Sequence, residues 1–219
     1  MKILHLSTFE QSGGAARAAM RLHEGLLING ADSQVLVMSK VSHKAQVHAM
    51  TRRIMQPFNV RARSRIDALP LMRYPNKTDA PWNVGRLSSG LSNKIEAINP
   101  DIVHMHWVGA GFFSIEEMKK LPKRWVWTMH DAWAFTGGCH VLGGCISFQE
   151  VCGYCPQLGS QRKDDLSHKG WLRRQELFLK NMPIIIAPSK WMSEQIRASS
   201  LLRDAQIEVI PNGLDTSIY

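Results

Sequence analysis

The sequence predicts a doubly wound α/β fold, in which helices cover both faces of a parallel β-sheet. Runs typical of strands alternate with runs typical of helices along the chain. The strand candidates are continuously apolar, as strands buried on both faces are. With 219 residues, 44% of them hydrophobic, the chain can bury a core as one large domain or two small ones. Ligands of such folds bind beyond the carboxyl ends of the strands, so the candidate sites are the loops at residues 8–14, at 108–112 and from 130 onward.

The first 98 residues predict two strands and two helices. Lys2–Ser7 is a short apolar strand, and a loop ending in two glycines leads to a helix at 15–31, rich in Ala, Leu and Arg. Ser33–Ser39 is the second strand. Residues 41–85 hold four prolines and predict irregular structure. A helix at Leu87–Ile98 ends before an Asn-Pro pair, because the residue before proline avoids the helical region.

The middle of the chain predicts two further strands around a short helix. Asp101–Trp107 (DIVHMHW) and Arg124–Met129 (RWVWTM) are the strands. The helix at Ser114–Leu121 starts with a capping box, in which Ser114 is followed three residues later by Glu117. A loop that contains every cysteine of the chain follows the second strand.

The last fifty residues continue the alternation. A helix is expected at Gly170–Asn181 and a buried strand at Pro183–Ala187. Ser189 is the expected N-cap of a helix at 189–199. The last strand, Ile207–Ile210, runs into a Pro-Asn-Gly turn.

The N-terminus has one lysine and only a short apolar run, which does not fit a secretory signal. No stretch approaches the roughly 20 apolar residues of a membrane-spanning helix. We therefore expect a soluble, cytoplasmic protein.

Positive charge is concentrated in residues 41–85. This segment holds eight basic and two acidic side chains, which gives +6 of the formal net charge of +9. Such a patch suits an anionic partner, namely phosphates, an acidic lipid surface or nucleic acid, and it can equally be a solvated surface.

Two glycines open the first helix. Gly13 and Gly14 can bring backbone amides close to a phosphate at the positive end of the helix dipole, and Arg17 can add charge one turn later. The pattern lacks the G-x-G-x-x-G spacing of a dinucleotide fingerprint, and a plain tight turn explains it equally well.

Histidines gather at the predicted strand ends. His104 and His106 point to the same face of one strand, which ends at Trp107, and they read equally as core histidines. His130 and Asp131 directly follow the next strand, where a histidine can hold a substrate hydroxyl or phosphate. Asp131 can also cap the following turn.

The cysteines have the spacing C-x5-C-x6-C-x2-C, at positions Cys139, Cys145, Cys152 and Cys155. Four thiolates so close together can surround one tetrahedral metal, and C-x2-C turns commonly supply two ligands. Structural zinc is the leading interpretation, and an iron–sulfur cluster, two disulfides and free thiols stay open. A cytoplasmic chain argues against disulfides. An all-cysteine site leaves no open coordination position, which favours a structural role.

Taken together, these segments resemble the N-terminal domain of a family 4 glycosyltransferase of the GT-B fold. The matching pieces are MKILHLST followed by GGAAR, PDIVHMHW, VWTMHDAWAFTGGC, IIIAPSKWM and VIPNGLD. The cysteine segment, which ends in CGYCPQL, resembles a subgroup associated with bacterial capsular and exopolysaccharide synthesis.

The resemblance implies a two-domain enzyme that transfers a sugar from a nucleotide-sugar donor to a polysaccharide or lipid-linked acceptor, with retention of configuration and no catalytic metal. Residues 1–219 would form its Rossmann-like, acceptor-side domain, with a basic insertion at 41–85 and a Cys-rich loop at 130–160. In the family, VIPNGLD leads into the donor-binding domain, which this chain lacks. We therefore expect the chain to be inactive alone.

The resemblance also assigns roles to residues. Gly13 and Gly14 would face the donor phosphates, and His130 would contact the transferred sugar as the catalytic candidate. His106, Trp107 and Asp131 are candidate substrate contacts. The basic segment would face an acidic or lipid-diphosphate-linked acceptor at the inner membrane surface. A metal at the cysteines would be scaffolding.

Two other functions compete with this interpretation. Cysteines plus positive charge suggest a zinc-containing nucleic-acid-binding module, but the two features lie in different segments and the fold is no typical nucleic-acid reader, so we expect no nucleic acid partner. A nicotinamide-dependent enzyme would need G-x-G-x-x-G and an acid at the end of the second strand, where this chain has Ser39 and Lys40.

Overall fold

A computed structural model describes residues 1–51, 56–122 and 124–214. Within these residues, seven strands form one sheet in the order β3-β2-β1-β4-β5-β6-β7, and every neighbouring pair is parallel. The strands are β1 Lys2–Phe9, β2 Asp32–Ser39, β3 Val47–Ala49, β4 Ile102–Met105, β5 Trp125–Thr128, β6 Ile184–Ala187 and β7 Ile207–Val209. The fold predicted from the sequence is confirmed.

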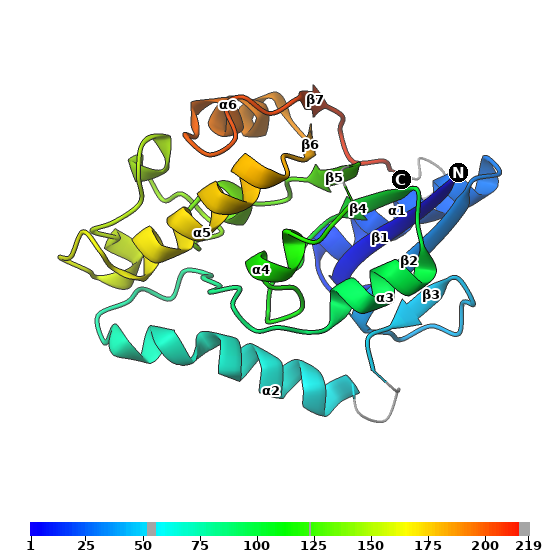
Figure 1. Ribbon diagram of the computed structural model, residues 1–219, viewed down its shortest axis with the longest axis horizontal. Coiled ribbons are helices and arrows are strands. Elements are labelled where there is room, and N and C mark those ends of the chain that lie inside the picture. Colours follow the sequence, from blue (N-terminus) through cyan, green and yellow to red (C-terminus); the bar gives the residue numbers. More distant parts are fainter. Residues whose placement is uncertain (52–55, 123, 215–219) are drawn as a thin grey trace.

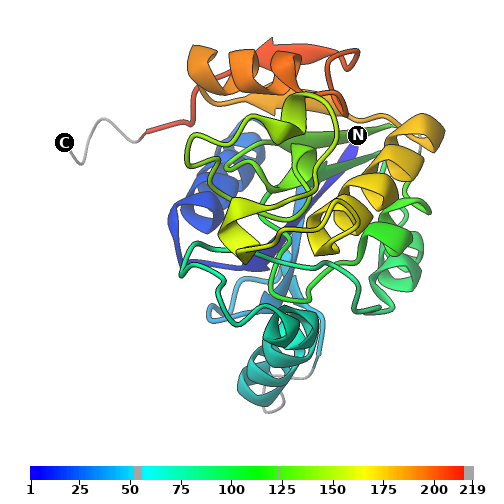
Figure 2. The ribbon, with the colours of Figure 1, turned by 90° about the vertical axis from the view of Figure 1, so that its left-hand side faces the viewer.

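Helices cover both faces of the sheet. Helix α1 lies on one face, and α3, α4 and α5 lie on the other (Figures 1 and 2). The α-helices are α1 Gly14–Ile28, α2 Gln56–Ala68, α3 Leu91–Ile98, α4 Ile115–Met118, α5 Leu166–Lys180 and α6 Lys190–Ala198. Short 3-10 turns are η2 Leu69–Arg73, η3 Trp133–Phe135, η4 Ser147–Gln149 and η5 Pro156–Leu158. No helix in the described ranges has the length and apolar character needed to cross a membrane.

The central strands carry the core. Leu4 and Leu6 of β1 are completely buried, as are Val103 and Met105 of β4. Helices cover both faces of these strands, and both faces carry buried side chains: Leu4, Leu6, Val103 and Met105 on one face, and His5 and His104 on the other.

Two predicted N-caps are confirmed. The Ser114 hydroxyl accepts the backbone N–H of Glu117, and the Ser189 hydroxyl accepts that of Met192. Helix α5 starts four residues earlier than expected because the carboxylate of Asp165 caps it, accepting the N–H groups of Ser167 and His168.

The prediction that residues 41–85 are irregular is wrong, because they contain β3, α2 and η2. Helix α2 has no apolar stripe in its sequence. Side-chain hydrogen bonds from its C-terminal half hold it against the rest of the fold instead. Arg63 donates to the carbonyl oxygens of Gly111, Leu87 and Ser88. The buried carboxylate of Asp67 accepts three N–H groups, those of residues 84–86. Of the eight basic residues predicted in this segment, Arg52 and Arg53 lie outside the described residues.

The strand order reverses between β1 and β4, since β2 and β3 continue on one side and β5 to β7 on the other. A crevice is expected outside the carboxyl ends of strands at such a switch point. The Cys-rich segment leaves β5 at this end of the sheet, toward the left of Figure 1. The fold thus brings the loops after β1, β4 and β5 to one edge.

Candidate active site

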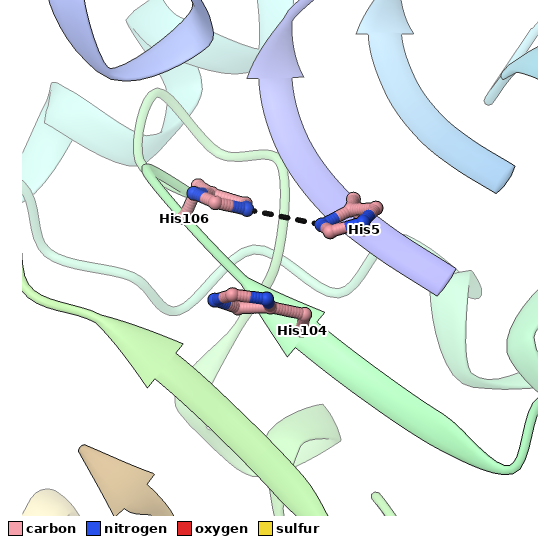
Figure 3. A group of neighbouring side chains, drawn as sticks. All are labelled: His5, His104 and His106. Carbon is pink, nitrogen blue, oxygen red and sulfur yellow. Dashed lines mark hydrogen bonds between the residues drawn. The ribbon is translucent and has the colours of Figure 1, made fainter. Parts of the chain in front are cut away.

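Three histidines form a hydrogen-bonded chain across the switch point. His5 Nδ1 lies 3.2 Å from His106 Nε2, the contact drawn in Figure 3, and His106 Nδ1 lies 3.1 Å from His130 Nε2. His5 belongs to β1, His106 directly follows β4 and His130 closely follows β5. The carboxyl ends of adjacent parallel strands meet at one edge of the sheet, which explains the contact between His106 and His130. His5 lies in the middle of β1 and reaches His106 because the register places it opposite His104.

Burial keeps these rings neutral. His5 and His106 are almost completely buried, and burial followed by the neighbouring histidines lowers the pKa of each well below its usual range. Burial also lowers the pKa of His130 to about 4, against the opposing influence of Asp131. At neutral pH the three hydrogen-bonded imidazole rings are therefore uncharged.

The hydrogen bonds that join these three histidines have a direction. A neutral imidazole carries one N–H and one lone pair. The buried Nε2 of His5 has no hydrogen-bond partner among the described residues, and an unpaired acceptor is less costly there than an unpaired N–H. We infer that His5 donates to His106 and His106 donates to His130, which leaves the proton of His130 on Nδ1.

His104 completes the cluster beside this chain. It pairs in register with His5, its ring stacks on His106 at 4.4 Å, and its Nε2 lies 2.8 Å from the Thr128 hydroxyl. Among the described residues, His5, His104 and His106 are the one group of three potential ligands whose donor atoms lie within 4.8 Å of one another. Figure 3 shows these rings side by side, with His5 and His106 already hydrogen-bonded to each other. Their contacts therefore fit a hydrogen-bonded cluster.

A cavity of about 330 Å³ opens beside the glycine loop. Gly13 has a φ of 88°, which favours glycine, and it precedes α1 without a side-chain cap. A Cβ at Gly13 or Gly14 would meet no atom within 4 Å, so open space faces the start of the helix. The lining residues are Ser7, Phe9, Ser12, Gly13, Gly14, Ala15, Ala16 and Trp107. Arg17 is exposed on the first turn of α1 and does not line this cavity.

Trp107 connects the glycine loop to the histidines. Its ring stacks on Phe9 at 5.9 Å, and it also lines a smaller hollow beside His106, His130 and Asp131. The indole Nε1 lies 3.3 Å from His140 Nδ1. The sequence-predicted residues Gly13, Gly14, His106, Trp107 and His130 thus lie along one edge of the sheet.

Both carboxylate oxygens of Asp131 have partners within the protein. Oδ1 accepts the backbone N–H of Trp133 at 2.9 Å, the capping contact considered for this residue. Oδ2 lies 2.6 Å from Nδ1 of the buried His140, whose Nε2 lies 3.0 Å from the Asn83 side-chain oxygen. Asp131 therefore ties the start of the Cys-rich loop to the residues after η2.

Three residues of this site were missed in the sequence. His5 lies within a largely apolar strand. Its place in the site can be recognised only from the register, which puts it opposite His104. Asn83 and His140 are far apart in the chain, and an antiparallel bridge between Trp82 and Cys139 brings them together. No local spacing marks that pairing.

All four cysteines line one cavity. None of them forms a disulfide. Arg63 of the basic segment is half-buried and hydrogen-bonded, whereas Arg61, Arg65, Arg73 and Lys77 are exposed. Part of the predicted basic patch therefore stabilises the fold, and part of it faces solvent.

The chain was compared with known proteins. The family model described as Glycosyltransferase Family 4 matches residues 12–218. A protein of Escherichia coli (strain K12), named as a glycosyl transferase of colanic acid biosynthesis, WcaC, is 25% identical over 237 residues. The alignment covers 98% of this chain and 55% of WcaC, so the chain spans about half the length of that relative.

Proposed function

This chain belongs to glycosyltransferase family 4, and from that membership we propose that it serves sugar transfer from a nucleotide-sugar donor to a saccharide or lipid-linked acceptor. The process we propose is bacterial cell-surface polysaccharide synthesis, because the relative WcaC is named for colanic acid biosynthesis. The observation that carries the proposal is the neutral His130, aligned by His106 at the switch point beside the open glycine loop.

The chain would form the acceptor-side half of a two-domain enzyme. Its match to about half of WcaC supports this arrangement. The second domain would hold most of the donor nucleotide, so residues 1–219 alone should not turn over substrate. Sugar transfer would take place between the two domains, at the carboxyl edge of this sheet.

His130 is the proposed catalytic residue, in contact with the transferred sugar. A pKa of about 4 leaves it uncharged at neutral pH, so it acts as a hydrogen-bond partner and not as a cationic acid. With its proton on Nδ1, it would donate to a sugar hydroxyl. The hydrogen bond from His106 fixes the ring, and Trp107 offers an aromatic face next to it.

We propose retention of anomeric configuration without a protein nucleophile. Asp131 is the carboxylate next to His130, and both of its oxygens are engaged by Trp133 and His140. That geometry favours a positioning role for Asp131 over attack on a sugar. The leaving phosphate would instead assist the acceptor hydroxyl.

The donor phosphates would lie against Gly13 and Gly14. The first N–H groups of α1 have no side-chain cap and face open space, and the helix dipole adds partial positive charge. Arg17 is exposed one turn later and would add charge from the rim of the site.

A peripheral contact with the inner membrane surface is also proposed, through α2 and η2. Exposed apolar side chains, Phe58, Ile66, Leu69 and Met72, accompany the exposed basic residues Arg61, Arg65 and Arg73 on these elements. Apolar groups beside basic ones suit an interface with anionic lipids, where a lipid-linked acceptor would reside.

The test of this function is an assay of the protein containing both proposed domains against a panel of nucleotide sugars and lipid-linked acceptors. Transfer from one donor is expected, and the 219-residue chain alone should give none. Failure of the two-domain protein with every donor would count against the proposal.

A further inference from the structure

The Cys-rich segment folds without regular secondary structure. Between the end of β5 and the start of α5 it contains only the short turns η3, η4 and η5. Loops of this length are uncommon inside a compact domain, and this one packs Trp133, Phe135 and Phe148 into the core. Cys139 and Cys145 lie in the first half of the loop, which leaves β5, and Cys152 and Cys155 lie in the second half, which leads to α5.

The four cysteines enclose a cavity of about 20 Å³. Such a volume holds about one water-sized sphere. Close backbone contacts confine the site. The position of a Cβ at Gly137 would lie 2.3 Å from the Ser167 carbonyl oxygen, and that of a Cβ at Gly170 would lie 2.0 Å from the Gly137 carbonyl oxygen. The loop therefore packs directly against the start of α5, with room for one small ion between the cysteines.

An unpaired positive charge lies next to the cysteines. The Arg174 side chain is 1% exposed, its guanidinium stacks on Trp133 at 4.4 Å and its Nη1 donates to the Gly170 carbonyl. In the part of the chain that the structure describes, its Nε and Nη2 are buried without hydrogen-bond partners. Within the described residues it has no carboxylate partner, and the first groups that favour its charge are Cys152 and Cys139. A buried guanidinium needs a compensating negative charge.

We propose that Cys139, Cys145, Cys152 and Cys155 bind one Zn²⁺ ion as a closed, structural tetrathiolate. Zn²⁺ with four thiolates carries a net charge of −2, which would compensate Arg174. Binding releases the remaining thiol protons to solvent. No three cysteine sulfurs lie within 4.8 Å of one another, whereas Zn–S bonds of about 2.3 Å hold sulfurs about 3.8 Å apart. Zinc would therefore draw the two parts of the loop together.

The cysteine site would take no part in sugar transfer, because four thiolates fill the coordination sphere of the zinc ion. Its role is to fix the loop that begins at His130 and Asp131. The inference goes beyond the proposed function, and it can hold or fail without sugar transfer.

The test is elemental analysis of the 219-residue chain purified without added metal. About one zinc per chain is expected, with four thiols becoming reactive for each zinc released by a chelator. Cobalt substitution should give the visible d–d bands of a tetrahedral thiolate site. Less than half a zinc with freely reactive thiols, iron with acid-labile sulfide, or two disulfides would each overturn the proposal.

Variants identify the ligands. C139S, C145S, C152S and C155S should each lose most of the zinc and lower the thermal midpoint. His140→Gln is the matched control, because His140 adjoins Cys139 but its ring nitrogens face Asp131 and Asn83. Retention of zinc in H140Q is expected, and its loss there would overturn the four-cysteine assignment. If a cysteine variant fails to fold, the thiol-to-zinc ratio of the unmodified chain still decides the question.

Discussion

His106 Nδ1 lies 3.1 Å from His130 Nε2, and the two rings stack at 5.4 Å. Behind this pair, His5 contacts the other nitrogen of His106. His130, the proposed catalytic histidine, is thus the half-buried end of a row of three neutral, hydrogen-bonded histidines that begins inside the sheet. Its tautomer and orientation are set by buried residues on two other strands.

Removing the hydrogen bond from His106 should impair transfer without unfolding the protein. In the proposed two-domain enzyme, H106F should lower kcat by about 100-fold, the scale of a misoriented catalytic group. H106N should recover part of this loss, because an asparagine side chain places its amide near the position of Nδ1. Steady-state kinetics of the three proteins give the comparison. Equal rates for all three would rule out the positioning role.

The neutral histidines should make stability depend on pH. The pKa values of His104 and His130 fall from the usual 6.5 to about 4 in the folded chain, mainly because of burial. Between those values the unfolded chain binds more protons, so the free energy of unfolding decreases as pH falls from 6.5 toward 4. Each such ring contributes a slope of up to about 1.4 kcal/mol per pH unit.

Urea unfolding at pH 7, 6 and 5 measures this slope, in a range where surface carboxylates stay ionised. The H104Q variant is the control, and it should show a shallower dependence than the parent. A free energy of unfolding that stays constant over this range would contradict the neutral cluster.

A methyl group at Gly14 should test the phosphate site. The Cβ of G14A would meet no protein atom within 4 Å, so folding should be little affected. The methyl would instead project toward the donor phosphates. We expect kcat/KM for the nucleotide sugar to fall by at least about 10-fold, the effect of one misplaced carbon in a tight site.

The matched control is G25A, a change on the same helix that also meets no atom within 4 Å. It should leave donor kinetics as in the parent enzyme. Identical kinetics for G14A and G25A would show that the donor phosphates do not lie against this loop.

Helix α2 should bind anionic vesicles. In sedimentation at low salt, the chain should bind vesicles containing phosphatidylglycerol and not neutral ones. R61E/R65E should weaken this binding by at least about 30-fold, at about 1 kcal/mol for each lost basic residue. R197E makes one comparable charge change at an exposed position on α6 and should bind as the parent does. Equal binding of all these proteins would refute the membrane contact, and a salt-dependent gel shift would favour nucleic acid instead.

The sequence predicted the architecture well because local signals determine it. Apolar runs located six of the seven strands, and the caps at Ser114 and Ser189 agree with the structure. From the sequence alone, the carboxyl-edge rule places His130 and Gly13 at one edge of the sheet. These features depend on residues that are neighbours in the chain.

Other features depend on contacts between distant residues, which one sequence does not reveal. Helix α2 is held by Arg63 and Asp67 and has no apolar stripe, and the four prolines of residues 41–85 predict irregular structure. The role of His5 depends on the register of β1 with β4. The link from Asp131 to Asn83 through His140 depends on the pairing of residues 82 and 139.

We propose that His130 contacts the sugar being transferred. The most direct measurement compares sugar transfer by the two-domain enzyme and its H130A variant, with circular dichroism and zinc content as checks on the fold. We predict transfer from one nucleotide sugar by the parent enzyme and a loss of at least about 100-fold in H130A, with the fold and the zinc retained. Transfer by a folded H130A at the rate of the parent enzyme would contradict the account.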